Sequence, residues 1–184
     1  MSYQAIIKRY LKSLQRDYND SLAAHQHTAE LSFRPSLDTL FKELATELNG
    51  SPDIVVILEP RNQARMGRPD WRIHDRTTLG VYGYIEAKGL STNAFDITVH
   101  EEQFNRYLSL GHKLIITDGI DFIYSFDEGV HPQIISLIDK SHMNGPDWSR
   151  LTLNPQFEVM MRRFFADPSP RIATRESSLS WLLC

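Results

Sequence analysis

The hydrophobic pattern changes its period near residue 50, which limits the chain to folds that combine helices with a sheet. Residues 37–48 carry apolar side chains at helical spacing, and Asn49 and Gly50 follow as a helix stop. The next segment, 54–58, is a continuous apolar run between two prolines, as in a strand buried on both faces. Residues 4–22 also have helical spacing. The first part of the chain therefore predicts two helices followed by a strand.

Four further segments have the composition of strands, and a helix divides them into two groups. The expected strands are residues 71–74, 81–88, 113–117 and 121–126. Between the groups, Thr98 and Glu101 form a capping box that opens a helix ending at Gly111. Short turns join the first three strands, which indicates antiparallel pairing, whereas the helix indicates a crossover to a parallel neighbour. The sequence predicts an α/β fold with a central mixed five-stranded sheet flanked by helices.

The C-terminal part carries weaker signals. Residues 127–154 are expected to be irregular, and apolar residues at helical spacing predict a helix over 155–165. We expect one domain over residues 1–150, with 151–184 as a helical extension or the start of a connector to a further domain. Residues 177–184 are largely apolar and lack a helix stop, which predicts that the chain is a fragment of a longer polypeptide.

The composition is that of a globular protein. Its 184 residues suit one domain, and a hydrophobic fraction of 41% is enough for a packed core. No apolar run approaches the roughly 18 residues that span a bilayer, and the N-terminus has no signal-peptide layout. We therefore expect a cytoplasmic protein with no membrane partner. The single cysteine, Cys184, excludes an internal disulfide and a thiolate-rich zinc site.

A short polar pattern carries the chemistry that we expect of this chain. Asp70 stands at the start of one predicted strand, and Glu86 and Lys88 lie two residues apart on the next. Because alternate residues of a strand share a face, Glu86 and Lys88 point the same way, together with Tyr82 and Tyr84. If the two strands pair, Asp70 approaches Glu86 across the sheet.

Two carboxylates on adjoining strands form a hard oxygen site that suits Mg²⁺ or Mn²⁺, with the backbone carbonyl of Ala87 as a further ligand. A metal held by Asp70 and Glu86 would activate water and neutralise charge on a phosphate. Lys88 would hold the water or stabilise the transition state. These parts match phosphodiester hydrolysis. The alternative is a surface Glu–Lys pair on a solvated strand, together with a turn aspartate.

Basic residues gather near this pattern, although the formal net charge of the chain is −3. The cluster consists of Arg61, Arg65, Arg68, Arg72 and Arg76. It fits a phosphate-contact patch beside the acidic site, or alternatively a solvated basic loop. His74 would share a strand face with Asp70 and Arg72 and is a further candidate for phosphate contact. His25 and His27 form a His-x-His pair without a convincing third metal ligand.

The signature Pro-Asp followed by Glu-x-Lys, at Asp70, Glu86 and Lys88, resembles that of the PD-(D/E)xK nuclease superfamily. The order of the predicted elements is also similar. The resemblance implies a restriction-endonuclease-like fold and a metal-dependent nuclease site at these three positions.

Two further motifs extend the resemblance. Gln103 and Tyr107 lie four residues apart, on one helix face, and resemble the Gln-x-x-x-Tyr motif of some nuclease branches. This implies that they support the site, whereas the alternative places Tyr107 in the core and Gln103 at its rim. Glu30 resembles the early acidic residue that these nucleases often place near the metal, and the alternative is an ordinary exposed carboxylate.

Most of residues 25–150 resemble the N-terminal nuclease domain of large single-chain restriction-modification enzymes. In those proteins the nuclease precedes a methyltransferase, sometimes with a helicase-like motor between them. The resemblance implies a magnesium-dependent deoxyribonuclease, the cleavage module of such an enzyme, with DNA and further domains of the same polypeptide as partners. The alternatives are a non-catalytic nucleic-acid-binding or assembly module on the same fold, and a free-standing repair exonuclease.

Overall fold

The computed structural model describes residues 2–23, 32–50, 53–59, 69–90, 96, 98–127 and 129–168. Its helices are α1 (Tyr3–Ala23), α2 (Arg34–Asn49), α3 (Glu101–Leu108) and α4 (Pro155–Ala166). Its strands are β1 (Ile54–Leu58), β2 (Trp71–Asp75), β3 (Val81–Ala87), β4 (Leu114–Thr117), β5 (Asp121–Ser125) and β6 (Gln133–Ser136). Single 3-10 turns cover Thr98–His100, Lys140–His142 and Trp148–Arg150. None of the helices in these ranges is long and apolar enough to cross a membrane.

The strands form one mixed sheet in which they follow one another in chain order, from β1 at one edge to β6 at the other. β3 and β4 are parallel, with α3 in the crossover between them. Every other neighbouring pair is antiparallel. The expectation of a mixed sheet with one crossover is confirmed, but the sheet has six strands, so the expected number of five is wrong.

The additional strand, β6, lies in a segment that we expected to be irregular. It pairs with β5 at the edge of the sheet, with Ser136 opposite Asp121. Its two isoleucines, Ile134 and Ile135, are adjacent, so the segment shows no alternation of apolar and polar residues. A strand of four residues that forms ladder hydrogen bonds on one side only gives too short a pattern to be recognised in the sequence.

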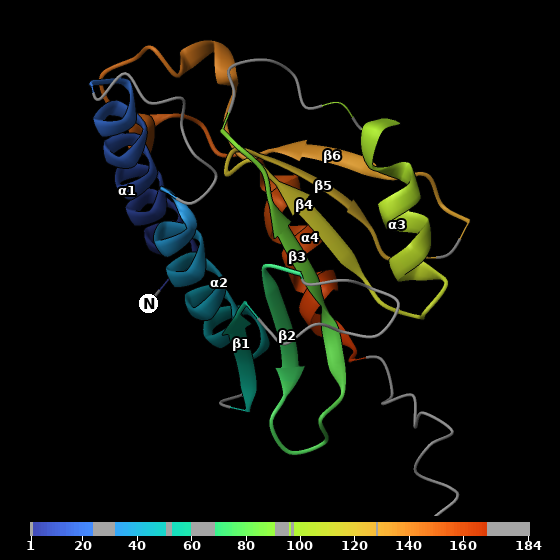
Figure 1. Ribbon diagram of the computed structural model, residues 1–184. Helices are drawn as coiled ribbons and strands as arrows, with labels where there is room; N and C mark the ends of the chain where they lie inside the picture. The colour runs from blue at the N-terminus through green and yellow to red at the C-terminus, as the bar shows by residue number, and fades with distance from the viewer. Residues whose placement is uncertain are drawn as a thin grey trace, which may run out of the picture.

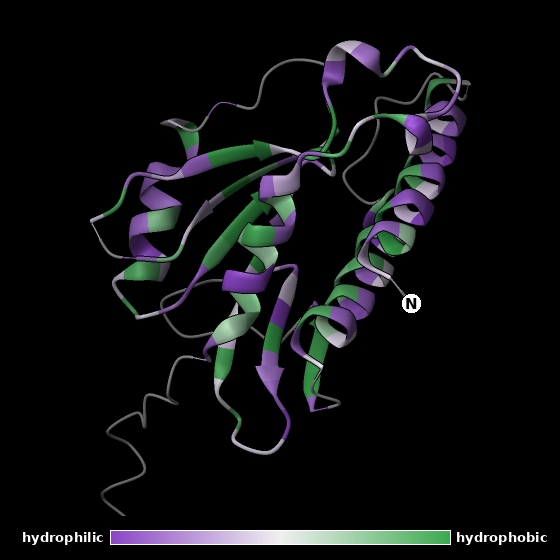
Figure 2. Ribbon diagram, turned by 180° about the vertical axis from the view of Figure 1, so that it is seen from behind, coloured by the Kyte–Doolittle hydropathy of each residue, from purple (hydrophilic) through white to green (hydrophobic). Residues whose placement is uncertain are grey.

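Helices lie on both faces of the sheet (Figure 1). α1, α2 and α4 contribute to the main core on one face, where they meet strand residues such as Ile85 and Phe122. In Figure 2, which shows the molecule from behind, α4 lies in front of the strands on this face. On the other face, Phe104 and Tyr107 of α3 pack with Tyr84 in a second cluster. The helix predicted over 155–165 is present as α4 and belongs to the main core, while the domain boundary at residue 150 stays a prediction.

A bulge in β3 separates two tyrosines that we expected on one face. Ile73 pairs with Gly83 but the next residue, His74, pairs with Val81, so the register shifts and Tyr82 is the extra residue. Tyr82 packs into the main core, whereas Tyr84 belongs to the cluster under α3. The expectation that Tyr82 shares a face with Glu86 and Tyr84 is therefore wrong. Strict alternation holds only beyond the bulge, where the candidate site lies.

A buried polar cluster holds the turn between β4 and β5. The Lys140 ammonium lies 2.5 Å from Asp118 Oδ2 and 2.6 Å from Asp121 Oδ2. The other oxygen of Asp118 accepts the backbone N–H groups of Ile120 and Asp121. The residue before this turn, Thr117, accepts the backbone N–H of Lys88 at 2.8 Å. The cluster therefore fixes the chain directly beside the residue that follows β3.

Candidate active site

Asp70 stands immediately before β2 and reaches across to β3. Trp71 pairs with Ile85, so Asp70 lies beside the end of the neighbouring strand. Its Oδ2 accepts the backbone N–H of Ala87 at 2.7 Å, and the residue is 8% exposed. Trp71 is fully buried and donates its indole N–H to Asp38, which anchors the start of β2. The expected approach of Asp70 to the Glu86–Lys88 strand is thus present as a hydrogen bond.

Glu86 lies on the face of β3 that α3 covers. Its Oε1 accepts the Gln103 amide at 3.0 Å and the Tyr107 hydroxyl at 3.3 Å. Burial, and then the Glu86 carboxylate, raise the pKa of the Tyr107 phenol well above its ordinary value. The phenol therefore stays protonated and donates to Glu86. Tyr107 is also buried in the cluster under α3, so this side chain serves both as core and as a partner of the candidate site.

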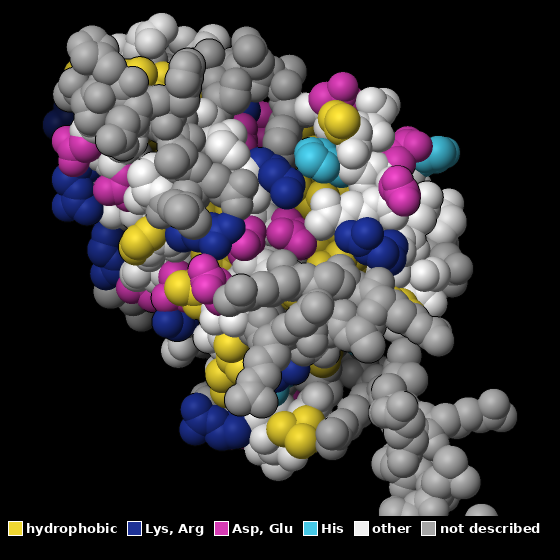
Figure 3. Space-filling view, in the orientation of Figure 1, with side chains coloured by type: hydrophobic (Ala, Val, Ile, Leu, Met, Phe, Trp, Pro, Cys, Tyr) yellow, Lys and Arg dark blue, Asp and Glu magenta, His cyan; other side chains and the backbone are white. Residues whose placement is uncertain are grey.

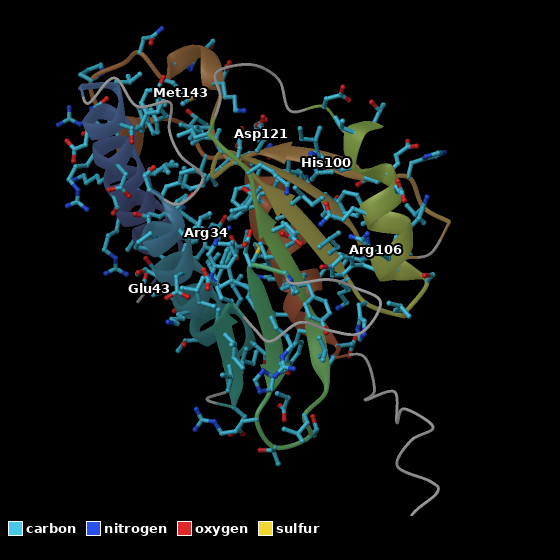
Figure 4. The ribbon with its side chains drawn as sticks, viewed as in Figure 1. Arg34, Glu43, His100, Arg106, Asp121 and Met143 are labelled. Atoms are coloured by element: carbon cyan, nitrogen blue, oxygen red, sulfur yellow. The ribbon has the colours of Figure 1, made fainter. Side chains whose placement is uncertain are left out.

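Lys88 follows the last residue of β3 and is half-buried. Its backbone N–H extends the parallel ladder to Thr117 of β4. His100, which precedes α3 (Figure 4), interacts electrostatically with Lys88. Burial, and then the charge of Lys88, lower the pKa of His100. His100 is therefore a neighbour of the candidate site that the sequence pattern did not reveal.

The first residue of α2, Arg34, contributes a basic group to the site (Figure 4). One guanidinium nitrogen lies 2.5 Å from Asp70 Oδ1, and another lies 3.4 Å from Glu59 Oε1. Arg34 was not among the predicted site residues, because an arginine at a helix start gives no sign of a carboxylate 36 residues away.

Arg72 and His74 alternate along β2, which begins directly after Asp70. His74 is 8% exposed. Burial, and then the charge of Arg72, lower the pKa of His74. Arg72 Nε and His74 Nδ1 have no hydrogen-bond partner in the part of the chain that the structure describes. Both atoms are buried from solvent.

Several predicted residues lie outside the described ranges. These are Glu30, Arg61, Arg65, Arg68, His25 and His27. Their expected roles stay predictions.

In the space-filling view, acidic side chains lie near the middle of the face shown, with lysine and arginine side chains around them (Figure 3).

The oxygen donors of Asp70 and Glu86 have the chemistry that Mg²⁺ prefers. Within the described ranges, no group of three or more acidic, histidine or cysteine side chains is arranged to hold a metal. Mg²⁺ needs no such cage, because it keeps several waters and is commonly held by one or two carboxylates together with phosphate oxygens. The residues therefore fit the ion, on the condition that Asp70 Oδ1 exchanges its guanidinium partner for the metal.

No protein-family model and no curated protein matches the chain. Among solved structures, the chain is similar to one in a cryo-electron-microscopy structure of a DrdV–DNA complex, with a TM-score of 0.52 and 19% identity. The similarity covers 88% of this chain and 14% of the other. At this level of identity it shows a shared fold, and the present chain spans a small part of the length of that protein.

Proposed function

We propose that this chain is a metal-dependent DNA endonuclease domain of the PD-(D/E)xK type with a restriction-endonuclease-like fold. The observation that carries the proposal is the hydrogen bond between Asp70 and the backbone of Ala87. It joins the start of β2 to the end of β3 at the position where Glu86 and Lys88 stand. The arrangement of two buried carboxylates beside a lysine suits phosphodiester hydrolysis.

In this proposal Asp70, Glu86 and the carbonyl of Ala87 hold Mg²⁺ or Mn²⁺. When bound, the ion supplies a Lewis acid that activates water and neutralises phosphate charge. Lys88 orients the attacking water or stabilises the charge on the phosphate in the transition state. Gln103 and Tyr107 hold the Glu86 carboxylate in one orientation, because both donate to the same oxygen.

Arg72 and His74 are the described candidates for contact with DNA phosphates near the reacting one. Arg61, Arg65 and Arg68 complete the proposed basic patch. The DNA in the complex of the structural neighbour supports DNA as the substrate, although the similarity itself concerns the fold. The short coverage of that neighbour supports further domains in the same polypeptide. We propose that they include the methyltransferase of a restriction-modification enzyme, with or without a helicase-like motor.

The test is cleavage of supercoiled plasmid with Mg²⁺ and with EDTA. We expect Asp70→Asn and Lys88→Met to lower the rate by at least about 100-fold, since one preorganised electrostatic group is worth roughly that much. Lys12→Met is the matched control, because Lys12 is an exposed lysine of α1. Thermal melting shows whether each variant is folded. Wild-type rates in both folded site variants would refute the proposed active site.

A non-catalytic DNA-binding or assembly module is the second candidate. The observation that favours it is the ion pair between Arg34 and Asp70, because a guanidinium already neutralises the predicted metal ligand. Such a module would retain DNA equally well in Mg²⁺ and in EDTA, and would leave the plasmid uncut in both.

A further inference from the structure

The two oxygens of Asp70 have different partners, and one of them is a cation. Oδ2 accepts the N–H of Ala87, while Oδ1 lies 2.5 Å from the Arg34 guanidinium. The Arg34 side chain is 14% exposed and that of Asp70 10%. A pair this well buried is held by mutual neutralisation, because an isolated charge there is costly. Arginine stays protonated in proteins, so it leaves the carboxylate only by moving.

A second carboxylate, that of Glu59, lies within reach of the same guanidinium. Glu59 Oε1 lies 3.4 Å from a different nitrogen of Arg34, and the Glu59 side chain is 51% exposed. The Glu59 backbone N–H donates to the Asp70 carbonyl at 2.6 Å, so the two acidic residues are tied together. Glu59 also has a φ of 48°, in the left-handed region that few side chains adopt. This backbone arrangement keeps Glu59 beside Arg34, whichever carboxylate the guanidinium contacts.

We propose that Arg34 is a positioning residue that occupies Asp70 in the metal-free domain and moves toward Glu59 when the metal binds. The inference rests on the proposed function, since it concerns the same carboxylate. A divalent ion and a guanidinium repel each other, so it is unfavourable for both to contact one carboxylate oxygen. Binding of the ion therefore includes the cost of breaking the Arg34–Asp70 pair, and contact with Glu59 lowers that cost. The pair preserves the shape of the empty site while it weakens metal affinity.

The experiment is calorimetric titration of the chain with Mn²⁺ in the absence of DNA. Arg34→Met removes the competing cation and keeps an unbranched side chain, so we expect Mn²⁺ to bind about tenfold more tightly than in wild type. Glu59→Gln removes the alternative partner, so we expect binding about threefold weaker. Arg9→Met is the matched control, because Arg9 pairs with Glu43 between α1 and α2, away from Asp70. The Mn²⁺ affinity of this variant should equal that of wild type.

A purely structural role for Arg34 predicts a lower melting temperature for Arg34→Met without tighter binding, and that result overturns the inference. If Arg34→Met fails to fold, the Glu59→Gln variant decides, since Glu59 is half-exposed. Unchanged Mn²⁺ affinity in Glu59→Gln also overturns the inference. Lack of Mn²⁺ binding by all variants overturns it as well. Plasmid cleavage by wild type and Asp70→Asn is measured separately, so failure of this inference is distinguishable from failure of the proposed nuclease.

Discussion

Lys140→Met should destabilise the domain through a cluster that contains no proposed catalytic group. The Lys140 ammonium contacts Asp118 and Asp121, and the exposed fractions of the three side chains are 11%, 1% and 4%. Methionine keeps much of the length and the apolar stem, so packing changes little while the charge disappears. The substitution leaves two neighbouring carboxylates buried without the lysine that neutralises them.

The expected cost follows from these contacts. Breaking a buried ion pair by removing one partner costs about 3–5 kcal/mol. Burial raises the pKa of Asp118, and the charge of Lys140 opposes that rise. Without Lys140 the pKa of Asp118 rises further, which makes protonation of the carboxylate easier and keeps the expected cost at about 3 kcal/mol. For a chain of this size, this corresponds to a melting temperature lower by about 6–12 °C.

The pH dependence of this loss has a definite sign. An acid whose pKa is higher in the folded state than in the unfolded state binds more protons when folded, so its contribution to stability falls as pH rises. The deficit of Lys140→Met relative to wild type should therefore be smaller at about pH 5 than at about pH 7. This difference separates loss of the charge from loss of packing, which does not depend on pH.

Urea denaturation of the purified chain measures the free energy of unfolding. The double variant Lys140→Met with Asp121→Asn should recover part of the loss, because it removes one of the two stranded charges. Lys12→Met, on the exposed face of α1, serves as the control for loss of a lysine. A change below about 0.5 kcal/mol in Lys140→Met, as at ordinary surface positions, would refute the reasoning.

Three other changes test separate parts of the structure. Gly83→Ala should destabilise the chain by about 1–3 kcal/mol, because a Cβ there would lie 2.5 Å from Phe164 Cε2; an unchanged melting temperature would contradict the close approach of β3 and α4. Tyr107→Phe, which loses one donor to Glu86, should slow plasmid cleavage by up to about tenfold, whereas an equal rate would exclude a supporting role. Burial lowers the pKa of His112, so the free energy of unfolding should fall as pH drops below 6.5, the ordinary pKa of histidine. His112→Gln should reduce this dependence on pH, measured by urea denaturation at several pH values.

The sequence predicted those parts of the structure that depend on local periodicity. Within the described residues, all four helices were expected, and so were five of the six strands. The approach of Asp70 to β3 followed from strand pairing. The spacing of Gln103 and Tyr107 indicated a shared helix face, and their place beside Glu86 was expected from the resemblance of their motif to that of some nucleases. β6 and the bulge at Tyr82 were not predicted. Both depend on how a partner strand offers its hydrogen bonds, which the residues of a single segment do not encode.

The place of the candidate site in the sheet explains why Arg34 could not be predicted. β3 and β4 are the parallel pair, and binding sites of α/β sheets commonly lie beyond the carboxyl ends of such strands. Glu86 lies near the carboxyl end of β3 and Lys88 just beyond it. Asp70 lies at the same end of the sheet, because β2 runs in the opposite direction and begins there. At this edge, α3 on one face supplies Gln103 and the first residue of α2 on the other supplies Arg34.

The two helices act on different carboxylates and in different ways. α3 brings neutral donors to Glu86, and neutral donors can stay in place when a metal binds. α2 brings a permanent cation to Asp70, and under our proposal that cation competes with the metal. If both contacts serve the proposed site, loss of Tyr107 should lower cleavage with little effect on Mn²⁺ affinity, whereas loss of Arg34 should change affinity first. Equal effects of the two variants on affinity would mean that the two contacts have the same role.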